Sequence, residues 1–586
     1  MYDLKITGGT VVDGTGAPRF DADVAVKDGK IVELRRRGPG DPPLDGPAAE
    51  TIDATGKIVA PGFVDIHTHY DGQVSWDSTL EPSSGHGVTT VVTGNCGVGF
   101  APVRPGKEDW LIGLMEGVED IPGTALTEGI SWGWESYPEY LDVVGKQEFA
   151  IDVGSQIAHG AVRAYAMGER GARNEPATPD DIAAMARLVQ EGIEAGALGF
   201  STSRTLGHRA IDGEPVPGTF AAEDELFGLG RAMAAGGRAV FELAPQGVAG
   251  EDIIAPKKEL EWMKRLAAEI DRPISFGMIQ VDAAPDLWRE QLDISAEAHA
   301  AGSQLYPQIA ARPFGMLFGF PGHHAFTHRP TFRRLKAECS REELAQRLAD
   351  PAVKSAILAE EDLPPDPNVL FDNMFALVQY SLGRIYALGD PPDYEPTVER
   401  TVENIASDRG EDPLSTLYDL MLEDNATAML MLPFYNYFYG NHDAIREMLL
   451  HPAGVVGLSD GGAHCGMICD ASYPTFLLTH WARDRHRGEK LPLEYLVRKQ
   501  SHDTAQLFGL TDRGVIQTGK KADINVIDMA SLTLHPAKMA YDLPAGGQRL
   551  VQGASGYSAT IVSGVVTRRD SVDTGARPGR LVRGAR

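Results

Sequence analysis

Histidine, cysteine and carboxylate side chains stand directly after several short apolar runs of this chain. His67 and His69 follow the first run, Cys96 follows the second, and Asp460 follows the last. Side chains two residues apart in an extended segment point to the same side, so the two imidazoles face a shared centre. Two imidazoles, a thiolate and a carboxylate are suitable ligands for Zn²⁺. The residue types therefore predict a metal site.

Four further polar side chains lie near the ends of such runs, and each has two interpretations. His159 either polarises a substrate carbonyl or orients a ligand, or it is a structural histidine at a His-Gly turn. Glu242 is either a metal ligand or a polar residue hydrogen-bonded inside the fold. Tyr306 is a candidate substrate contact, and Arg312 follows six residues later. The Arg312 guanidinium either binds a substrate carboxylate through two hydrogen bonds or lies on the surface.

Eight apolar, strand-like runs separated by helical segments must position these side chains. The runs are 63–66, 89–92, 151–157, 198–200, 239–243, 274–279, 304–306 and 455–458. Strands that alternate with helices indicate a parallel sheet, and eight of them suit a closed (β/α)8 barrel of the TIM type, although a long open sheet has the same pattern. Because a barrel's active site lies at the carboxyl ends of its strands, the residues after each run are the candidates for chemistry.

The two chain ends have a different pattern, with short strands around glycine turns. Neither 1–60 nor 511–586 is large enough for a secure core by itself, so we expect both to pair into one small β-sandwich domain. Residues 61–510 then form the barrel. A stretch at about 313–450 separates the seventh and eighth strands, and we interpret it as a large insertion or lid.

Composition restricts the class of protein. The chain has 586 residues, with 82 acidic and 54 basic side chains and a formal charge of −28, which disfavours binding to nucleic acid or to an anionic membrane. Four cysteines are too few for a disulfide framework in a chain of this length. The beginning of the sequence does not resemble a signal peptide, and apolar runs are too short to span a membrane, so we expect a cytoplasmic protein with a small-molecule substrate.

Several motifs resemble those of the N-acyl-D-amino-acid deacylases, or D-aminoacylases, a branch of the amidohydrolase superfamily. They are APGFVDIHTHYDG (60–72), HGVTTVVTGNCGVGFAPVRPG (86–106), AHGAVR (158–163), GALGFSTS (196–203), LYP (305–307) and GLSDGGAH (457–464). The resemblance covers nearly the whole chain, and the GNCG segment is its most specific part. It implies a barrel with an end-paired β domain, zinc, and hydrolysis of an N-acyl amino acid. His67 and His69 would be metal ligands, Cys96 a bridging thiolate and Asp460 the catalytic carboxylate.

Two expected family histidines are replaced in this chain. The fifth strand reads AVFELA and has Glu242 at the family's histidine position, while the sixth reads SFGMIQ and has Gly277 or Met278 there. Neither Gly nor Met replaces an imidazole well. We therefore expect one tightly bound Zn²⁺ rather than two.

The predicted activity is hydrolysis of the amide bond of N-acyl amino acids, of D configuration by resemblance, by metal-activated hydroxide. Asp460 would take a proton from the attacking water and return it to the leaving nitrogen. The substrate would carry a carboxylate. Two alternatives remain: a hydrolase of another amide, a cyclic amide or a lactone, and a non-catalytic binding protein with a decayed site. A homo-oligomer is compatible with the sequence.

Overall fold

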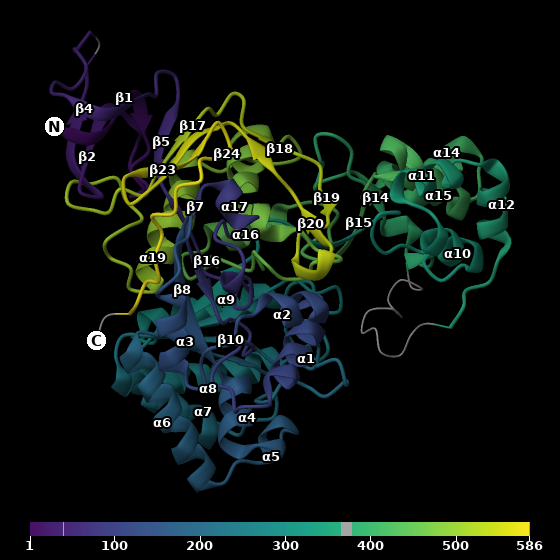
Figure 1. The fold of residues 1–586 in the computed structure, drawn as a ribbon, viewed down its shortest axis with the longest axis horizontal. Helices are drawn as coiled ribbons and strands as arrows, with labels where there is room; N and C mark the ends of the chain where they lie inside the picture. Colours follow the sequence, from purple (N-terminus) through teal and green to yellow (C-terminus); the bar gives the residue numbers. More distant parts are fainter. Residues whose placement is uncertain (39, 365–377, 585–586) are drawn as a thin grey trace.

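A parallel barrel forms the centre of the protein in the computed structural model, which describes residues 1–38, 40–364 and 378–584 (Figure 1). Its eight strands pair in sequence order and are β6 (Phe63–Asp65), β7 (Val88–Thr93), β8 (Asp152–Ala158), β9 (Gly199–Ser203), β10 (Val240–Ala244), β11 (Ile274–Gly277), β12 (Leu305–Ile309) and β16 (Val455–Val456). Residues just beyond β6 and β16 close the ring. Asp460 donates its backbone N–H to the His67 carbonyl at 3.1 Å, and His69 donates to the Gly461 carbonyl at 2.8 Å. The predicted barrel is confirmed.

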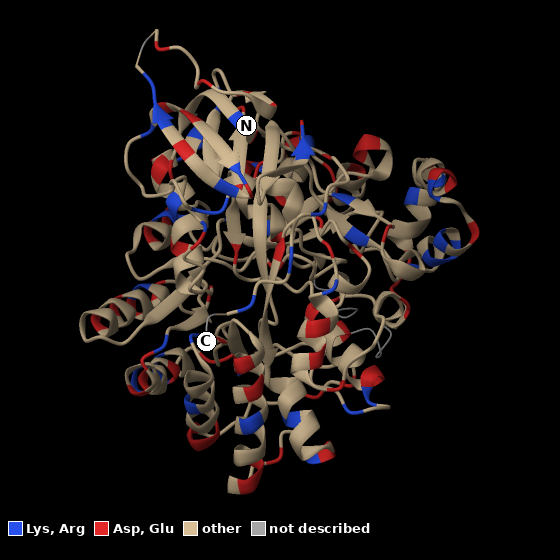
Figure 2. Ribbon diagram, turned by 60° about the vertical axis from the view of Figure 1, so that its left-hand side comes forward, with Lys and Arg blue, Asp and Glu red and all other residues tan. Residues whose placement is uncertain are grey.

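Helices surround the strands. Those that cover the first seven strands are α1 (Glu108–Glu119), α2 (Gly123–Gly129), α3 (Tyr137–Val144), α4 (His159–Met167), α5 (Glu169–Ala172), α6 (Pro179–Ala195), α7 (Glu223–Gly236), α8 (Ala255–Ile270) and α9 (Leu287–Ala300). The start of α6 illustrates why they form. Thr178 and Asp181 make a reciprocal capping box around Pro179, and the helix ends at Gly196 with φ of 117°. In Figure 2 acidic and basic residues are interspersed along such outer helices.

The amino end of the barrel is closed by an apolar layer. Val64, Val92 and Val240 from the strands pack with Leu507 and Phe508, which belong to a helical segment near the end of the chain. That segment contains α18 (Leu493–Arg498), the π-helix Lys499–Asp503 and α19 (Thr504–Leu507). The carboxyl ends of the strands are therefore the end at which a substrate can enter.

Strands from both chain ends form one nine-stranded sheet, which confirms the predicted end-paired β domain. Its strands are β1 (Tyr2–Val11), β2 (Phe20–Lys27), β3 (Lys30–Arg36), β4 (Ala48–Asp53), β5 (Ile58–Pro61), β17 (Ile524–Ile527), β22 (Tyr557–Val562), β23 (Val565–Arg569) and β24 (Val572–Asp573). The two ends join where β5 pairs antiparallel with β17. A separate apolar core, including Ile6, Val24 and Ile524, stabilises this sheet. Division of the chain at residues 60 and 511 stays a prediction.

Between β12 and β16 the chain forms a lobe that projects to one side of the molecule (Figure 1). It contains a three-stranded sheet of β13 (Phe314–Phe318), β14 (Tyr386–Ala387) and β15 (Leu430–Tyr435). Its main helices are α10 (Pro330–Glu338), α11 (Arg341–Leu348), α12 (Pro351–Ala359), α14 (Val402–Arg409) and α15 (Pro413–Ala426). The lobe has its own apolar core, which includes Phe332, Leu417 and Leu430. After it, α16 (Asp443–Leu450) leads back to the barrel.

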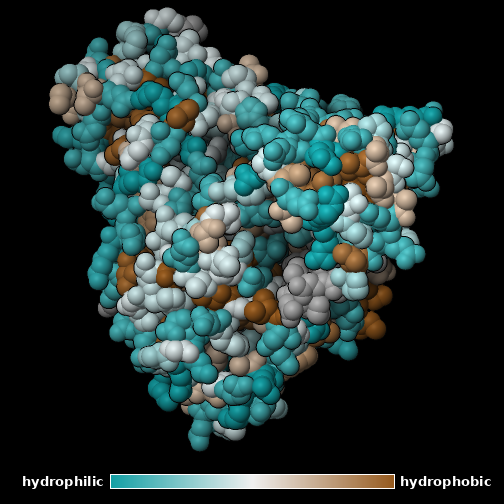
Figure 3. All heavy atoms as spheres, turned by 45° about the vertical axis from the view of Figure 1, so that its right-hand side comes forward, coloured by the Kyte–Doolittle hydropathy of each residue, from teal (hydrophilic) through white to brown (hydrophobic). Residues whose placement is uncertain are grey.

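The surface is mainly hydrophilic on the face shown in Figure 3, where apolar atoms occur in small groups. Among the described residues, none of the helices is both long and apolar enough to cross a membrane.

Candidate metal centre

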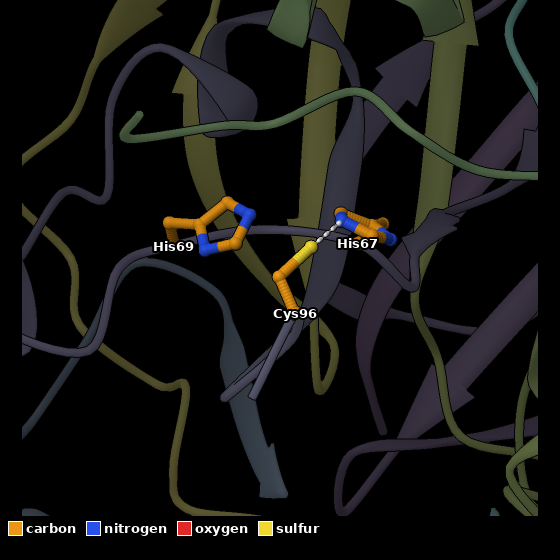
Figure 4. Close-up of side chains that lie close together, drawn as sticks. All are labelled: His67, His69 and Cys96. Atoms are coloured by element: carbon orange, nitrogen blue, oxygen red, sulfur yellow. Dashed lines mark hydrogen bonds between the residues drawn. The ribbon is translucent and has the colours of Figure 1, made fainter. Parts of the chain in front are cut away.

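Three of the predicted ligands converge at the carboxyl end of the barrel (Figure 4). His67 and His69 follow β6, and Cys96 follows β7 in a turn where its φ is 56°. The Cys96 sulfur lies 3.4 Å from His67 Nε2. The ligand atoms of all three residues lie within 4.8 Å of one another, and all three side chains are buried. These donors are close enough together to bind a shared metal ion.

Asp460 supplies a fourth donor from the turn after β16. Its Oδ1 lies 3.3 Å from His67 Nε2 and 3.7 Å from His69 Nε2. The side chain is 13% exposed, whereas those of His67 and His69 are 2% and 1% exposed. Asp460 therefore lies on the side of the centre that faces the opening of the barrel, where a substrate would arrive.

The chemistry of these donors fits a divalent transition metal. Burial lowers the pKa of His67 to about 4 and that of His69 to about 3, so both imidazoles are neutral and keep a lone pair. Burial, followed by the nearby carboxylates of Glu242 and Glu119, raises the pKa of the Cys96 thiol. A bound cation would reverse this effect by stabilising the thiolate. Distances of 3.3 and 3.4 Å from His67 Nε2 to its neighbours match the spacing of ligands around one Zn²⁺.

Each imidazole also has an oxygen beside its other nitrogen. Gln308 Oε1 lies 2.7 Å from His67 Nδ1, and Glu119 Oε1 lies 3.3 Å from His69 Nδ1. An acceptor at Nδ1 keeps the proton there and directs the Nε2 lone pair to the metal. Gln308 therefore orients His67, whereas Glu119 lies close to His69 without a hydrogen bond between them.

Glu242 lies beside the centre rather than among the converging ligand atoms. Its Oε2 accepts a hydrogen bond from the Cys96 backbone N–H at 2.9 Å. Its Oε1 is 3.9 Å from His67 Nδ1, the nitrogen on the far side of the ring from Asp460. Burial raises the pKa of Glu242 to about 8. Oε2 thus holds the Cys96 turn in place, whereas Oε1 is buried without a hydrogen-bond partner, so the role of Glu242 as a metal ligand stays a prediction.

Both ring nitrogens of His159 have partners inside the protein, which favours the structural one of its two interpretations. Nδ1 lies 2.8 Å from Thr202 Oγ1, and Nε2 lies 2.9 Å from Glu225 Oε1. Arg163 also binds Glu225. With both nitrogens occupied and the ring fully buried, His159 acts as a structural residue between β9 and α7.

Tyr306 lies at the opposite end of the barrel from His67, His69 and Cys96, so its predicted substrate contact has no support in the structure. Its ring packs against His299 of α9, with 4.8 Å between ring centroids, and against the apolar layer that closes the amino end. The physical reason is its position in β12. Tyr306 and Gln308 share a face of the strand, but two residues advance the chain by about 6.6 Å, so only Gln308 reaches the centre.

Arg312 is buried, which excludes its predicted placement on the surface, and its partners are other residues of the protein. Its Nη2 donates to Asp470 Oδ1 at 3.0 Å and to the Cys469 carbonyl at 2.6 Å. The guanidinium stacks 3.8 Å from the centroid of the Tyr394 ring and is 1% exposed. Because its charge already has a buried partner, its role in holding a substrate carboxylate stays a prediction.

His464 and His208 are two further residues near the centre that sequence reasoning missed. His464 Nε2 lies 3.8 Å from Glu119 Oε2, and the His464 side chain is 20% exposed. His208, in the loop after β9, has a pKa lowered to about 4 by burial and then by His69. The GLSDGGAH motif contains His464 and offered a signal. His208 and Glu119 lie in segments without a recognisable motif.

Glu119 reaches the centre because the loop after Asp460 is tied to the end of α1. The backbone N–H of His464 donates to the Glu119 carbonyl. Asp120, the residue directly after α1, accepts a hydrogen bond in its side chain from the Gly466 N–H at 2.9 Å. These bonds hold a helix end and a strand-end loop together, although the two are distant in sequence.

Comparison with known proteins identifies the family of this chain. The model of the amidohydrolase family matches residues 50–568, which is most of the chain. The chain belongs to the amidohydrolase family. Among curated relatives, D-aminoacylase of Alcaligenes xylosoxydans xylosoxydans is 27% identical over 99% of this chain and 97% of its own length.

Two solved structures share the fold of the present chain. A D-aminoacylase crystal structure has a TM-score of 0.64 at 24% identity, with complete coverage of both chains. N-acyl-D-glutamate deacylase from Bordetella bronchiseptica, complexed with zinc and a phosphonate inhibitor, has the same TM-score, identity and coverage.

Proposed function

We propose that the protein hydrolyses the amide bond of N-acyl amino acids, with preference for the D configuration, and uses Zn²⁺. The observation that carries this proposal is the convergence of His67, His69, Cys96 and Asp460 at the open end of the barrel. The full-length similarity to a D-aminoacylase supports the substrate class. The presence of these four donors favours an enzyme over a binding protein with a decayed site.

His67, His69 and Cys96 would hold one Zn²⁺, which polarises the acyl carbonyl and makes water more acidic when it is bound. Asp460 lies beside both imidazoles on the exposed side of the centre. Its carboxylate takes a proton from the attacking water and then returns this proton to the amide nitrogen, which leaves as an amine. One residue thus acts as base and then as acid.

After Asp460, His464 is the second residue that we place in contact with the substrate. It follows Asp460 by four residues, is partly exposed and is attached to Glu119 through its backbone N–H. Its largely buried position lowers its pKa, so the ring is neutral and its N–H can donate a hydrogen bond. We assign to it the orientation of the substrate's acyl oxygen.

A substrate panel tests this function. Zinc-loaded protein is assayed with N-acetyl-D-amino acids, their L isomers, cyclic amides and lactones. We expect hydrolysis of the D compounds, loss of it in His67→Ala, and retention in His486→Ala, a change at an exposed histidine. Faster turnover of a cyclic amide or a lactone would replace the proposed substrate class, and turnover that survives His67→Ala would refute the metal centre.

A further inference from the structure

A second group of possible metal ligands lies outside the centre described above. Glu395 belongs to the lobe between β12 and β16, His442 immediately precedes α16, and His480 lies in the π-helix Leu477–Asp484. Glu395 and His442 are 2% and 0% exposed, and the His480 side chain is 15% exposed. Three segments distant in sequence therefore bring ligating side chains to one nearly buried point.

The separations among these ligand atoms are those of a metal site. His442 Nδ1 lies 3.1 Å from His480 Nε2, and His480 Nε2 lies 3.2 Å from Glu395 Oε2. The third distance, from His442 Nδ1 to Glu395 Oε2, is 3.8 Å. Around a tetrahedral Zn²⁺ with bonds of about 2.0 to 2.1 Å, neighbouring ligand atoms lie about 3.3 Å apart. Two of the three distances are as short as those from His67 Nε2 to Cys96 Sγ and to Asp460 Oδ1, which are 3.4 and 3.3 Å.

Hydrogen bonds fix which nitrogen of His442 faces the other ligands. His442 Nε2 lies 2.8 Å from the Tyr394 carbonyl, which can only accept, so the ring proton is on Nε2. Nδ1 therefore presents a lone pair to His480 and Glu395. Burial keeps the pKa of His442 well below its usual value, so a second proton is disfavoured. The ring planes of His480 and Phe476 are stacked, with centroids 4.6 Å apart, which holds His480 in position.

Arg485 holds the carboxylate of Glu395, the third possible ligand of this group, through hydrogen bonds. Arg485 donates to Glu395 Oε1 at 2.9 Å and to Oε2 at 3.1 Å, and the backbone N–H of His442 donates to Oε1 at 2.7 Å. A carboxylate has about four acceptor sites, so Oε2 can still bind a cation. Asp443 binds Arg485 at 2.7 Å and offsets its positive charge. Arg487 also donates to the Glu395 backbone carbonyl at 2.7 Å, so the formal charge of Glu395, Asp443, Arg485 and Arg487 together is zero.

We propose that Glu395, His442 and His480 form a second, structural site for a divalent transition metal such as Zn²⁺, separate from the catalytic centre. The partly exposed edge of His480 gives the ion an entry path and leaves a position for water. Because Glu395 comes from the lobe and His480 from a helix packed on the barrel, the bound ion would join the two. The alternative occupant of the same space is a proton shared by the two imidazoles.

Metal counting in variants of the full-length protein distinguishes the two occupants. Protein loaded with Zn²⁺ is freed of loose metal by gel filtration, and the metal is then measured by elemental analysis. We expect His67→Ala/Cys96→Ser, which removes the catalytic centre, to keep one Zn²⁺ per chain. Adding His480→Gln should remove that ion, whereas adding His486→Gln, a change at an exposed histidine nearby in sequence, should not.

X-ray absorption provides a readout that does not depend on the His480 variant. Zinc in His67→Ala/Cys96→Ser should have only nitrogen and oxygen neighbours, with an imidazole signature. Folded His67→Ala/Cys96→Ser protein that retains no zinc would overturn the proposal and show that a proton fills the space. Hydrolysis by His480→Gln should continue, so failure of this site and failure of the proposed function give different results.

Discussion

The amide oxygen of Gln308 lies 2.7 Å from Nδ1 of His67, inside the barrel. Gln308 is itself fixed, because its Nε2 donates to Ser275 Oγ at 3.1 Å, so the oxygen must face the histidine. This places an uncharged acceptor behind one ligand, while the Glu119 carboxyl group lies behind the other. Of the two oxygens, the Gln308 oxygen is hydrogen-bonded to its histidine and fixes the direction in which His67 Nε2 points.

Gln308→Leu should weaken metal binding. Without an acceptor at Nδ1 the His67 ring loses its fixed orientation, and such losses lower metal affinity by about 10- to 100-fold. Competition with a chelator measures the change. Tyr306→Phe, on the same face of β12 but at the other end of the barrel, is the matched control and should leave the affinity unaltered. Equal effects of both changes would show that only strand packing was disturbed.

Asp460→Asn should yield folded, metal-loaded protein with kcat lowered by about 100-fold or more, because general acid–base catalysis contributes on that scale. Steady-state kinetics on the best substrate of the panel, with metal content measured in parallel, checks this. Asp271→Asn, at the end of α8, should behave as the unaltered enzyme. A loss below tenfold would mean that another group carries the proton, and His464 would be the next residue to test.

Glu242→Gln should leave one metal ion in the catalytic centre. An amide oxygen can accept the hydrogen bond from the Cys96 N–H as the carboxylate does, and the other oxygen lies on the far side of His67 from Asp460. Elemental analysis of protein that also carries His480→Gln measures only the metal of the catalytic centre, because this change removes the second proposed site. If His480→Gln protein held two ions and Glu242→Gln removed one of them, Glu242 would be a ligand of a second catalytic metal.

Arg312→Ala should destabilise the fold without changing substrate preference. The change leaves Asp470 buried without its cation, and removal of one partner of a buried pair costs about 3 to 5 kcal/mol. Urea unfolding measures the loss, with Arg173→Ala as control because that arginine is in an exposed ion pair worth little. A loss of kcat/KM confined to substrates that bear a carboxylate would restore the substrate-binding role.

The buried side chain of His86 should lower the free energy of unfolding of the protein in mild acid. Its Nδ1 lies 2.8 Å from Thr475 Oγ1 and its Nε2 2.8 Å from the Gln552 carbonyl. Burial lowers its pKa to about 4, below the value of about 6.5 in an unfolded chain, so the unfolded state binds a proton first as pH falls. Its contribution to stability is complete above pH 6.5 and decreases toward pH 4, by about 2 kcal/mol between pH 7 and pH 5.

The check is urea unfolding of wild-type and His86→Gln protein at both pH values. Glutamine can donate and accept but does not titrate in this range, so the variant should lose less stability between pH 7 and pH 5. The change His486→Gln, at an exposed histidine, should keep the wild-type pH dependence. Equal losses of unfolding free energy between pH 7 and pH 5 in wild type and in His86→Gln would contradict the role assigned to His86.

Local pattern was sufficient for the barrel and for four candidate ligands. The alternation of a strand puts His67 and His69 on one side, and a parallel barrel brings the carboxyl ends of its strands to one place, so Cys96 and Asp460 could be added from their positions along the chain. These features depend on periodicity of two residues and on strand order, which short stretches of sequence encode.

The partners of the remaining residues depend on contacts between distant segments. Arg312 is paired with Asp470, and His159 is paired with Glu225. Glu119 lies beside His69 because the end of α1 is hydrogen-bonded to the loop after Asp460. Whether a buried polar side chain faces a substrate or the protein depends on which of many possible partners packing brings within about 3 Å, and neither spacing nor composition encodes that choice.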